Sequence, residues 1–337
     1  MQDLAYWLPV AWVAVLGAAV ALYVVLDGFD LGIGILFPVH PEETHRDQMM
    51  NSVAPFWDGN ETWLVLGGGG LLVAFPLAYS IIMPAVYLPV LIMLLALVFR
   101  GVAFEFRWVA KPRHRMWDIA FAGGSIVAAF TQGIILGTIL EGISVEGHAF
   151  GGGTFDWLTP FPILIGAAVV AGYGLLGATW LIMKTDGEVQ AQAREQAKLL
   201  LPVVLIALAI VSLWTPFALT RVFERWFTLP NLFWLAPVPL LTAYAAWRCW
   251  SGLQKGHNTA PFVATIALFL LGFVGLAASN LPYIVPPTFD IWQAAAHPSS
   301  QLFMLVGVLI LLPIILTYTI FVYYTFRGKV RHGEGYH

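Results

Sequence analysis

Two pairs of carboxylates with the same spacing are the residues most suited to chemistry. Asp27 and Asp30 follow an apolar run that begins at Trp7, and Asp58 and Glu61 open the next apolar run. Residues three apart lie on one face of a helix, so each pair can act together. Closely spaced carboxylates in a low-dielectric region hold protons more tightly than in water, which suits them to a proton relay.

A purely structural interpretation fits the two pairs unequally. Asp58 and Glu61 lie where a helix N-terminus favours negative charge, and Pro55 suits a helix start, so capping explains them as well as function does. Asp27 and Asp30 lie toward the C-terminal end of a helix, where the helix dipole disfavours carboxylates. The sequence therefore favours a functional role for Asp27 and Asp30.

Arg100 ends a later apolar run, at the same end of the predicted helices as the two carboxylate pairs. It could therefore neutralise these carboxylates. Arg107 follows it and is interpreted as an anchor on the cytoplasmic side. The candidate site is therefore Asp27, Asp30, Asp58, Glu61 and Arg100, acting in proton delivery rather than in redox chemistry.

The elements that must position these residues are transmembrane helices. The chain has 337 residues, of which 59% are hydrophobic and 10% charged, against about 25% charged in soluble proteins. A membrane-crossing helix needs roughly 20 apolar residues. The uncharged runs predict a single all-α transmembrane domain with about nine spans, approximately 7–37, 57–79, 80–104, 117–140, 157–184, 199–220, 227–248, 260–285 and 299–326.

The basic residues predict the orientation of these spans. Every Lys and Arg except Arg221 and Arg225 falls in the loops and tail of one side. Because cytoplasmic loops are enriched in Lys and Arg, the N-terminus is expected outside and the C-terminus in the cytoplasm. The first and fifth predicted spans both run into an Asp-Gly pair, at Asp27 and Asp186. This repeat suits two parallel four-helix units plus one extra helix, although a match of one dipeptide also arises by chance.

Residues for cofactors and other partners are sparse. None of the eight histidines lies inside a predicted span, and Cys249 is the single cysteine. Membrane-buried haem usually needs axial His or Met ligands on helices, so this chain is not expected to bind haem by itself. No cluster typical of zinc or iron–sulfur sites is present, and no metal site is expected. The net charge of −3 gives no indication of nucleic-acid binding.

Two motifs point to a family. The sequence Leu26-Asp27-Gly28-Phe29-Asp30-Leu31-Gly32, together with Trp57-Asp58-Gly59-Asn60-Glu61, resembles subunit II of the cytochrome bd family of quinol oxidases. The resemblance continues through Gly67–Gly70 and Phe99-Arg100-Gly101 to Pro282–Pro287 and covers essentially the whole chain. The cyanide-insensitive branch is the closest in pattern.

This resemblance implies a function. The oxidase complex oxidises quinol, reduces dioxygen to water and contributes to the proton-motive force of aerobic respiration in the bacterial cytoplasmic (inner) membrane. The resemblance places the haems, b and d or b only, in subunit I. Subunit II is then a haem-free partner that supports subunit I and offers protons a route from the cytoplasm, and the isolated chain would not be catalytic.

The resemblance also implies how the site residues and further partners are used. Proton uptake would fall on Asp58, with Asp27, Asp30, Glu61 and Arg100 as its neighbours. Some relatives hold a structural quinone, and small single-span accessory subunits are further expected partners, besides the lipid bilayer.

Two departures from the family pattern affect these expectations. Some relatives have His where this chain has Phe56, so a relay through that His cannot operate here. Some have an acidic residue where this chain has Gln293. Two alternative functions stay open on the sequence alone, namely a proton-coupled secondary transporter and a purely structural membrane subunit.

Overall fold

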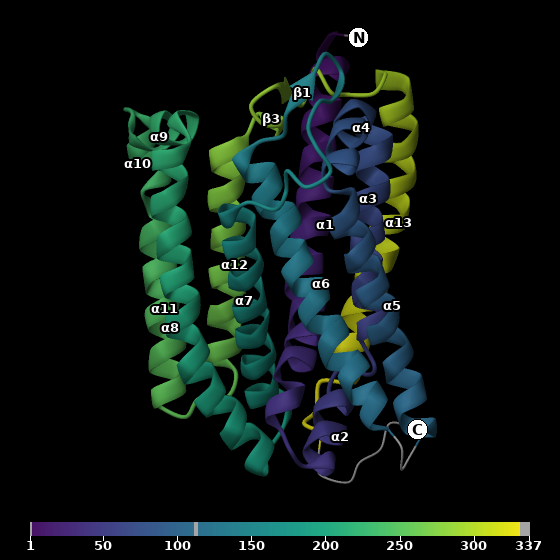
Figure 1. The fold of residues 1–337 in the computed structure, drawn as a ribbon, viewed down its shortest axis with the longest axis vertical. Helices are drawn as coiled ribbons and strands as arrows, with labels where there is room; N and C mark the ends of the chain where they lie inside the picture. Colours follow the sequence, from purple (N-terminus) through teal and green to yellow (C-terminus); the bar gives the residue numbers. More distant parts are fainter. Residues whose placement is uncertain (1, 111–113, 331–337) are drawn as a thin grey trace.

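Long apolar segments form long helices that run side by side in one bundle (Figure 1). The computed structural model describes residues 2–110 and 114–330. Its long helices are α1 (Gln2–Leu36), α3 (Trp57–Ala74), α5 (Tyr87–Val109), α6 (Arg115–Glu141), α7 (Pro160–Lys184), α8 (Gly187–Ala218), α11 (Pro237–Gln254), α12 (Ala260–Asn280) and α13 (Pro298–Thr325). The predicted all-α transmembrane bundle is thus confirmed.

Short elements join these helices. They are the 3-10 helix η1 (Phe37–Val39), α2 (Glu43–Asn51), α4 (Pro76–Ala85), α9 (Thr220–Phe227) and α10 (Asn231–Leu235). Two antiparallel hairpins pair β1 (Val145–Glu146) with β2 (Ala149–Phe150), and β3 (Tyr283–Val285) with β4 (Phe289–Asp290). The hairpins lie at one end of the bundle and α2 at the other, and these ends are called the hairpin end and the α2 end (Figure 1).

The predicted count of nine spans is not confirmed. Among the described residues, seven helices are long and apolar enough to cross a membrane, or eight if the pair Thr220–Phe227 and Asn231–Gln254, bent by 86°, is one broken span. The helix α3 falls outside this set because its first turns carry Asp58, Asn60 and Glu61. The same polar residues are therefore both the candidate site and the reason why this segment is weakly apolar.

Several predicted helix limits were wrong, each for a local reason. The turn expected near residues 76–80 is instead the short helix α4, because the chain breaks at Phe75, before Pro76, and again at Val86. The helix that contains the sixth span, which was expected over 199–220, begins earlier, at Gly187, because its first turns are helical but polar. The seventh is broken near Pro230 and Pro237, which interrupt helical hydrogen bonding.

The bundle is closest where α1 crosses α7. A Cβ added to Gly32 would lie 1.9 Å from the carbonyl oxygen of Tyr173, and one added to Gly177 would lie 2.4 Å from the Gly32 backbone. Glycine is thus required for this approach. Helices α3 and α6 pack against α1, α8 and α12 adjoin α7, and α6 also packs along α7, so the predicted grouping into two four-helix units stays a prediction.

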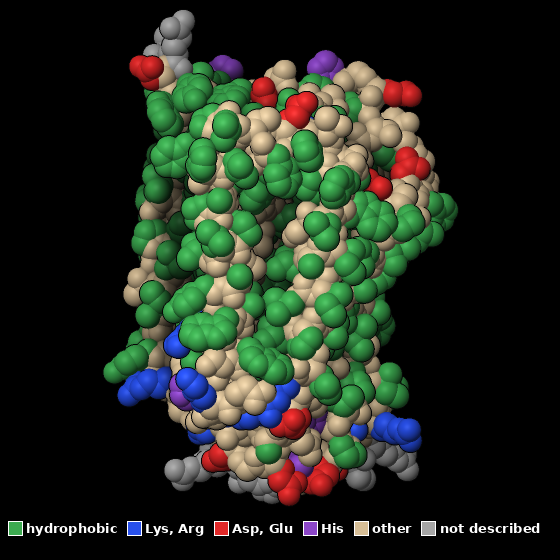
Figure 2. Space-filling model, turned by 90° about the vertical axis from the view of Figure 1, so that its left-hand side faces the viewer, with side chains coloured by type: hydrophobic (Ala, Val, Ile, Leu, Met, Phe, Trp, Pro, Cys, Tyr) green, Lys and Arg blue, Asp and Glu red, His purple; other side chains and the backbone are tan. Residues whose placement is uncertain are grey.

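Charge is distributed unevenly along the bundle. On the face shown in Figure 2, hydrophobic side chains cover the sides, and the Lys and Arg side chains gather near one end. That end is the α2 end, where the partly exposed Arg46 and Arg194 lie. The bundle therefore has an apolar belt with a basic rim on one side.

Candidate functional site

Arg100 is the centre of a buried ionic cluster. Its side chain is fully buried on α5. The Nη1 atom lies 2.8 Å from Asp27 Oδ1 and 2.7 Å from Glu61 Oε1, and Nη2 lies 3.8 Å from Asp30 Oδ2. Asp27 and Asp30 come from α1 and Glu61 from α3, so three helices converge on one guanidinium. Arginine suits this role because its planar fork presents several donors at once.

Neutral side chains complete the surroundings of Asp30. Asn60 Nδ2 donates to Asp30 Oδ2 at 2.7 Å and lies 3.3 Å from the backbone oxygen of Leu26. The Tyr323 hydroxyl, on α13, donates to Asn60 Oδ1 at 3.0 Å. Asp30 is therefore held from α3 directly and from α13 through Asn60.

A second neutral chain reaches Asp27 from the middle of the bundle. The Tyr173 hydroxyl donates to Gln132 Oε1 at 2.8 Å, and Gln132 Nε2 donates to the Tyr23 hydroxyl at 2.7 Å. The Tyr23 hydroxyl in turn interacts with the Asp27 carboxylate, one turn along α1. The two hydrogen bonds run from Tyr173 through Gln132 to Tyr23, in the direction of Asp27. An amide does not readily pass a proton on, so the chain positions Asp27 rather than extending a relay beyond Gln132.

The motif from Trp57 to Glu61 divides between two sides of α3. Asn60 is buried against α1, whereas Asp58 is exposed in the first turn of the helix. Glu61, with a side chain 27% exposed, lies between them and reaches Arg100. Asp58 is near enough to Glu61 for their charges to repel, but it makes no ion pair with Arg100. The sequence expectation that four carboxylates form one cluster is therefore corrected to three, with Asp58 outside.

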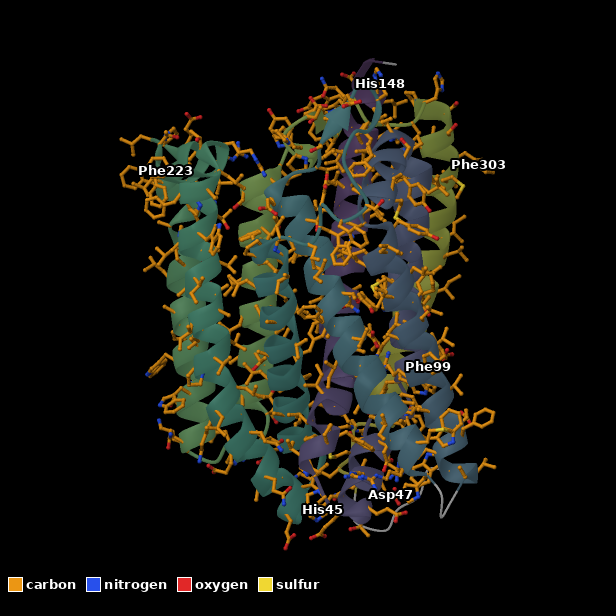
Figure 3. All side chains as sticks on the ribbon, in the orientation of Figure 1. His45, Asp47, Phe99, His148, Phe223 and Phe303 are labelled. Carbon is orange, nitrogen blue, oxygen red and sulfur yellow. The ribbon has the colours of Figure 1, made fainter. Side chains whose placement is uncertain are left out.

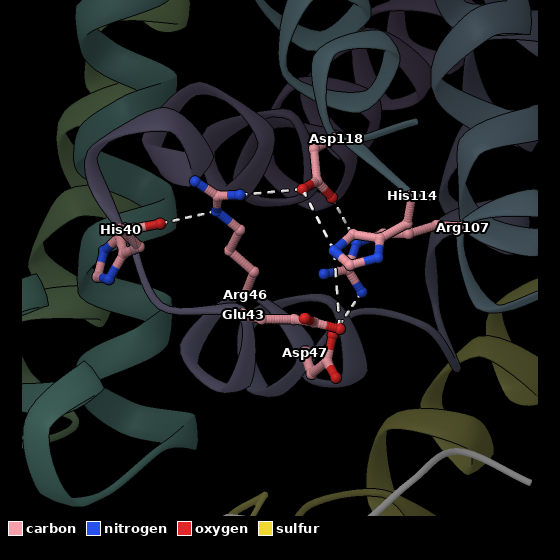
Figure 4. A network of polar contacts seen from close by, with 7 residues as sticks. All are labelled: His40, Glu43, Arg46, Asp47, Arg107, His114 and Asp118. Carbon is pink, nitrogen blue, oxygen red and sulfur yellow. Dashed lines mark hydrogen bonds and ion pairs between the residues drawn. The ribbon is translucent and has the colours of Figure 1, made fainter. Parts of the chain in front are cut away.

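A separate polar network ties α2 to the bundle (Figure 4). The fully buried Arg107 pairs with Asp47 on α2 and with Asp118 Oδ1 on α6, the latter at 2.6 Å. Arg46 Nη1 reaches Asp118 Oδ2 at 2.9 Å, and Arg46 Nε donates to the His40 carbonyl at 2.7 Å. Arg107 is thus a buried link between helices, and this replaces the expected role of a plain surface anchor.

His40 belongs to the same region but is not an ionic partner through its ring. The ring is buried and lies 3.0 to 3.4 Å from the Gln196 amide on α8. Burial lowers the pKa of His40 below its usual value, although the hydrogen bond with Gln196 acts in the opposite direction. A neutral His40 ring therefore links η1 to α8 at neutral pH.

The charges of the Arg100 cluster decide what it can do. One cation faces three carboxylates, of which Asp27 and Asp30 are fully buried, and an excess of negative charge there is costly. The cluster approaches neutrality only by binding protons, and its members then titrate together. Glu61 alone among the three carboxylates keeps access to the surface. This arrangement suits the uptake and storage of protons.

The sequence predicted the charged members of the cluster and missed the neutral ones. Asp27, Asp30, Glu61 and Arg100 were found because charges are rare beside apolar runs. Tyr23, Gln132 and Tyr323 gave no comparable signal, because single polar residues in apolar helices are common. Asn60 lies inside the recognised motif, and its offset from Asp58 by two residues could have indicated that it faces the opposite side of α3.

Comparisons with known proteins identify the family of this chain. A family model described as cytochrome bd terminal oxidase subunit II matches residues 8–326. Subunit 2 of the cytochrome bd ubiquinol oxidase of Bacillus subtilis (strain 168) is 31% identical over 324 residues, which cover 92% of this chain and 93% of the relative. Subunit 2 of the cytochrome bd-I ubiquinol oxidase of Escherichia coli (strain K12) is 28% identical over 360 residues, covering 95% and 94%.

The fold has a solved counterpart as well. A chain of the bd oxidase from Geobacillus thermodenitrificans superposes with a TM-score of 0.77 at 16% identity, covering 94% of this chain and 98% of that one. At this identity the likeness concerns the fold alone. Because the family model spans residues 8–326, nearly the whole chain, and the Bacillus subtilis relative is 31% identical over 92% of it, this protein belongs to the cytochrome bd terminal oxidase subunit II family.

Proposed function

We propose that this chain is the haem-free subunit of a terminal quinol:oxygen oxidoreductase and that it delivers protons to the oxygen-reducing site of its partner. Relatives of this chain are subunits of ubiquinol oxidases. The partner is a subunit I that carries the haems, b and d or b only, and oxidises quinol. The isolated chain is then not catalytic, because it would hold neither the haems nor the quinol site.

The graded exposure of the carboxylates carries this proposal. Asp58 is exposed, Glu61 is partly exposed, and Asp27 and Asp30 are fully buried beside Arg100. A proton taken up at Asp58 passes to Glu61 and then into the shared cluster. Carboxylates that are costly in a membrane are more readily explained by proton transfer than by anchoring.

The distribution of basic residues supports a cytoplasmic source for these protons. Lys and Arg gather at the α2 end, which is the cytoplasmic side if the usual rule for loop charge holds. The C-terminal end of α13 and the cluster entrance then face the cytoplasm, and α1 begins outside. Protons consumed in making water come from the cytoplasm, while quinol oxidation releases protons outside, so the complex builds a proton-motive force without a pump.

Neutralising the entrance tests the proposal. The variants Asp58→Asn and Glu61→Gln are expected to slow quinol-driven oxygen consumption of the intact, haem-loaded complex. A positioned proton-transferring side chain contributes about 10²–10⁴-fold, so a loss of roughly tenfold or more is expected even if water partly bypasses the route. The measurement is oxygen uptake per haem, recorded across pH with an oxygen electrode.

A matched control separates the proposal from its rivals. Glu195→Gln removes another exposed carboxylate, on α8, and is expected to leave turnover unchanged. Near-normal turnover of both entrance variants at every pH would refute proton delivery. A loss of assembled complex with unchanged turnover per complex would favour a purely structural subunit. Proton-coupled solute uptake by the chain alone in liposomes would favour a secondary transporter.

Three finer expectations remain predictions at this stage. They are membership of the cyanide-insensitive branch, a structural quinone held by this subunit, and small single-span accessory subunits. A lipid extract and a subunit analysis of the purified complex test the last two directly.

A further inference from the structure

Three side chains converge at the α2 end, away from the Arg100 cluster. Glu42 precedes α2, His45 follows within its first turn, and Glu188 lies in the first turn of α8. The His45 Nε2 atom is 3.3 Å from Glu42 Oε2 and 3.5 Å from Glu188 Oε2. All three ligand atoms lie within 4.8 Å of one another. Figure 3 shows His45 at this end of the molecule, where α2 and α8 approach each other.

The distances differ from those of an ordinary hydrogen-bonded pair. Charge-assisted N–H···O bonds are about 2.7–2.9 Å long, and both separations from His45 Nε2 exceed this range. Ligands about 2.0–2.1 Å from a tetrahedral zinc ion are separated from one another by about 3.3 Å. The imidazole nitrogen is thus spaced from both carboxylates as it would be around a shared ion.

The surroundings supply a second, independent observation. The His45 side chain is only 6% exposed, and its Nε2 atom faces the two carboxylates, whose own side chains are 59% and 76% exposed. In the described ranges, neither Glu42 nor Glu188 forms an ion pair with a Lys or Arg. Arg46, the cation next to His45, is directed instead to Asp118 and the His40 carbonyl.

We propose that Glu42, His45 and Glu188 form a binding site for a divalent transition-metal ion of the zinc type. One imidazole and two carboxylates are a ligand set that zinc accepts, with a fourth position left to water. The imidazole disfavours Mg²⁺ and Ca²⁺, which take oxygen ligands. This site differs from the expectation that the chain holds no metal, which arose because Glu188 is distant in sequence from the other two ligands.

The ion would join the start of α2 to the start of α8. Glu42 and His45 belong to the segment that is tied through Arg107 to α5 and α6, whereas Glu188 belongs to α8. A metal bridge would therefore fix α2 against α8 at the surface where α1 and α7 also end. Ions that bind the folded state alone stabilise it, so metal binding is expected to raise the melting temperature.

Direct zinc binding tests the site, independently of turnover. The intact complex is stripped with a chelator and titrated with Zn²⁺ against a chromophoric zinc indicator, and the wild-type complex is compared with His45→Gln and Glu188→Gln. Loss of an outer-shell partner alone costs about 10–100-fold in affinity, so loss of a ligand is expected to cost at least this much. The wild-type complex should bind one equivalent of zinc more than either variant. Zinc should raise the melting temperature of the wild type but not that of the variants.

Matched controls make the result decisive. Glu195→Gln on the same helix and His148→Gln at the opposite end remove exposed groups of the same types and should bind zinc as the wild type does. Haem content and the zinc-free melting temperature report whether each variant is folded. Glu188→Gln changes an exposed side chain and is expected to fold even if His45→Gln does not. Equal zinc binding by the wild type and Glu188→Gln would overturn the site.

Discussion

Arg100 compensates several buried carboxylates at once, and this makes its charge essential for folding. Removing one partner of a buried ion pair costs about 3–5 kcal/mol, because the remaining charge loses its compensation. Arg100→Met is therefore expected to lower the melting temperature and the yield of assembled complex strongly. Arg100→Lys keeps the charge but loses the planar fork that reaches Asp27 and Glu61 together, so a smaller loss is expected. Thermal unfolding of the purified complex measures both.

A compensating substitution shows whether uncompensated charge is the cause. In the double variant Asp27→Asn with Arg100→Met, the carboxylate that would be buried without a cationic partner is also removed. The double variant should therefore be more stable than Arg100→Met by itself. Arg327→Met, which changes an exposed arginine beyond α13, serves as the matched control and should melt as the wild type does. If Arg100→Met itself melted at the wild-type temperature, the ion pairs seen around Arg100 would contribute nothing to stability.

At the scale of elements, the crossing of α1 and α7 depends on backbone contact. A methyl group on Gly32 would meet backbone atoms of Tyr173 and Gly177, which cannot rotate away. Gly32→Ala is expected to destabilise the bundle by about 1–3 kcal/mol, the usual cost of overpacking. Gly272→Ala on α12 is the control, because an added Cβ meets nothing within 4 Å there. Equal melting temperatures for the two variants would mean that α1 and α7 separate without cost.

The elements also show which features a sequence can predict. Uncharged runs predicted the long helices because backbone N–H and C=O groups must form hydrogen bonds within the lipid. A helix is one of the few structures in which an apolar segment satisfies all of them. They did not predict the polar start of α8 at Gly187, since a polar helix outside the membrane has no hydropathy signal. The outward direction of Asp58 depends on how α3 is rotated against α1, and only packing sets that rotation. The pairing of Arg100 with carboxylates was thus predicted, but the neutral partners of the cluster and the position of Asp58 outside it were not.

For the whole molecule, the distribution of charge predicts how the bundle lies in the membrane. Basic residues gather at the α2 end, so that end is expected in the cytoplasm and the hairpin end outside. The single native cysteine, Cys249, is fully buried, so cysteines introduced at the surface can be labelled over a low background. Thr154 and Glu195 are exposed positions at the hairpin end and the α2 end, respectively.

Labelling from outside the cell then decides the orientation. A membrane-impermeant maleimide is expected to label Thr154→Cys in intact spheroplasts, and to label Glu195→Cys only after the membrane is permeabilised. The unmodified chain should stay unlabelled in both conditions, because Cys249 has no exposed surface. The reverse pattern would place Asp58 and Glu61 at the outer surface. Protons for water formation would then have to come from outside, and oxygen reduction through this cluster would no longer consume cytoplasmic protons.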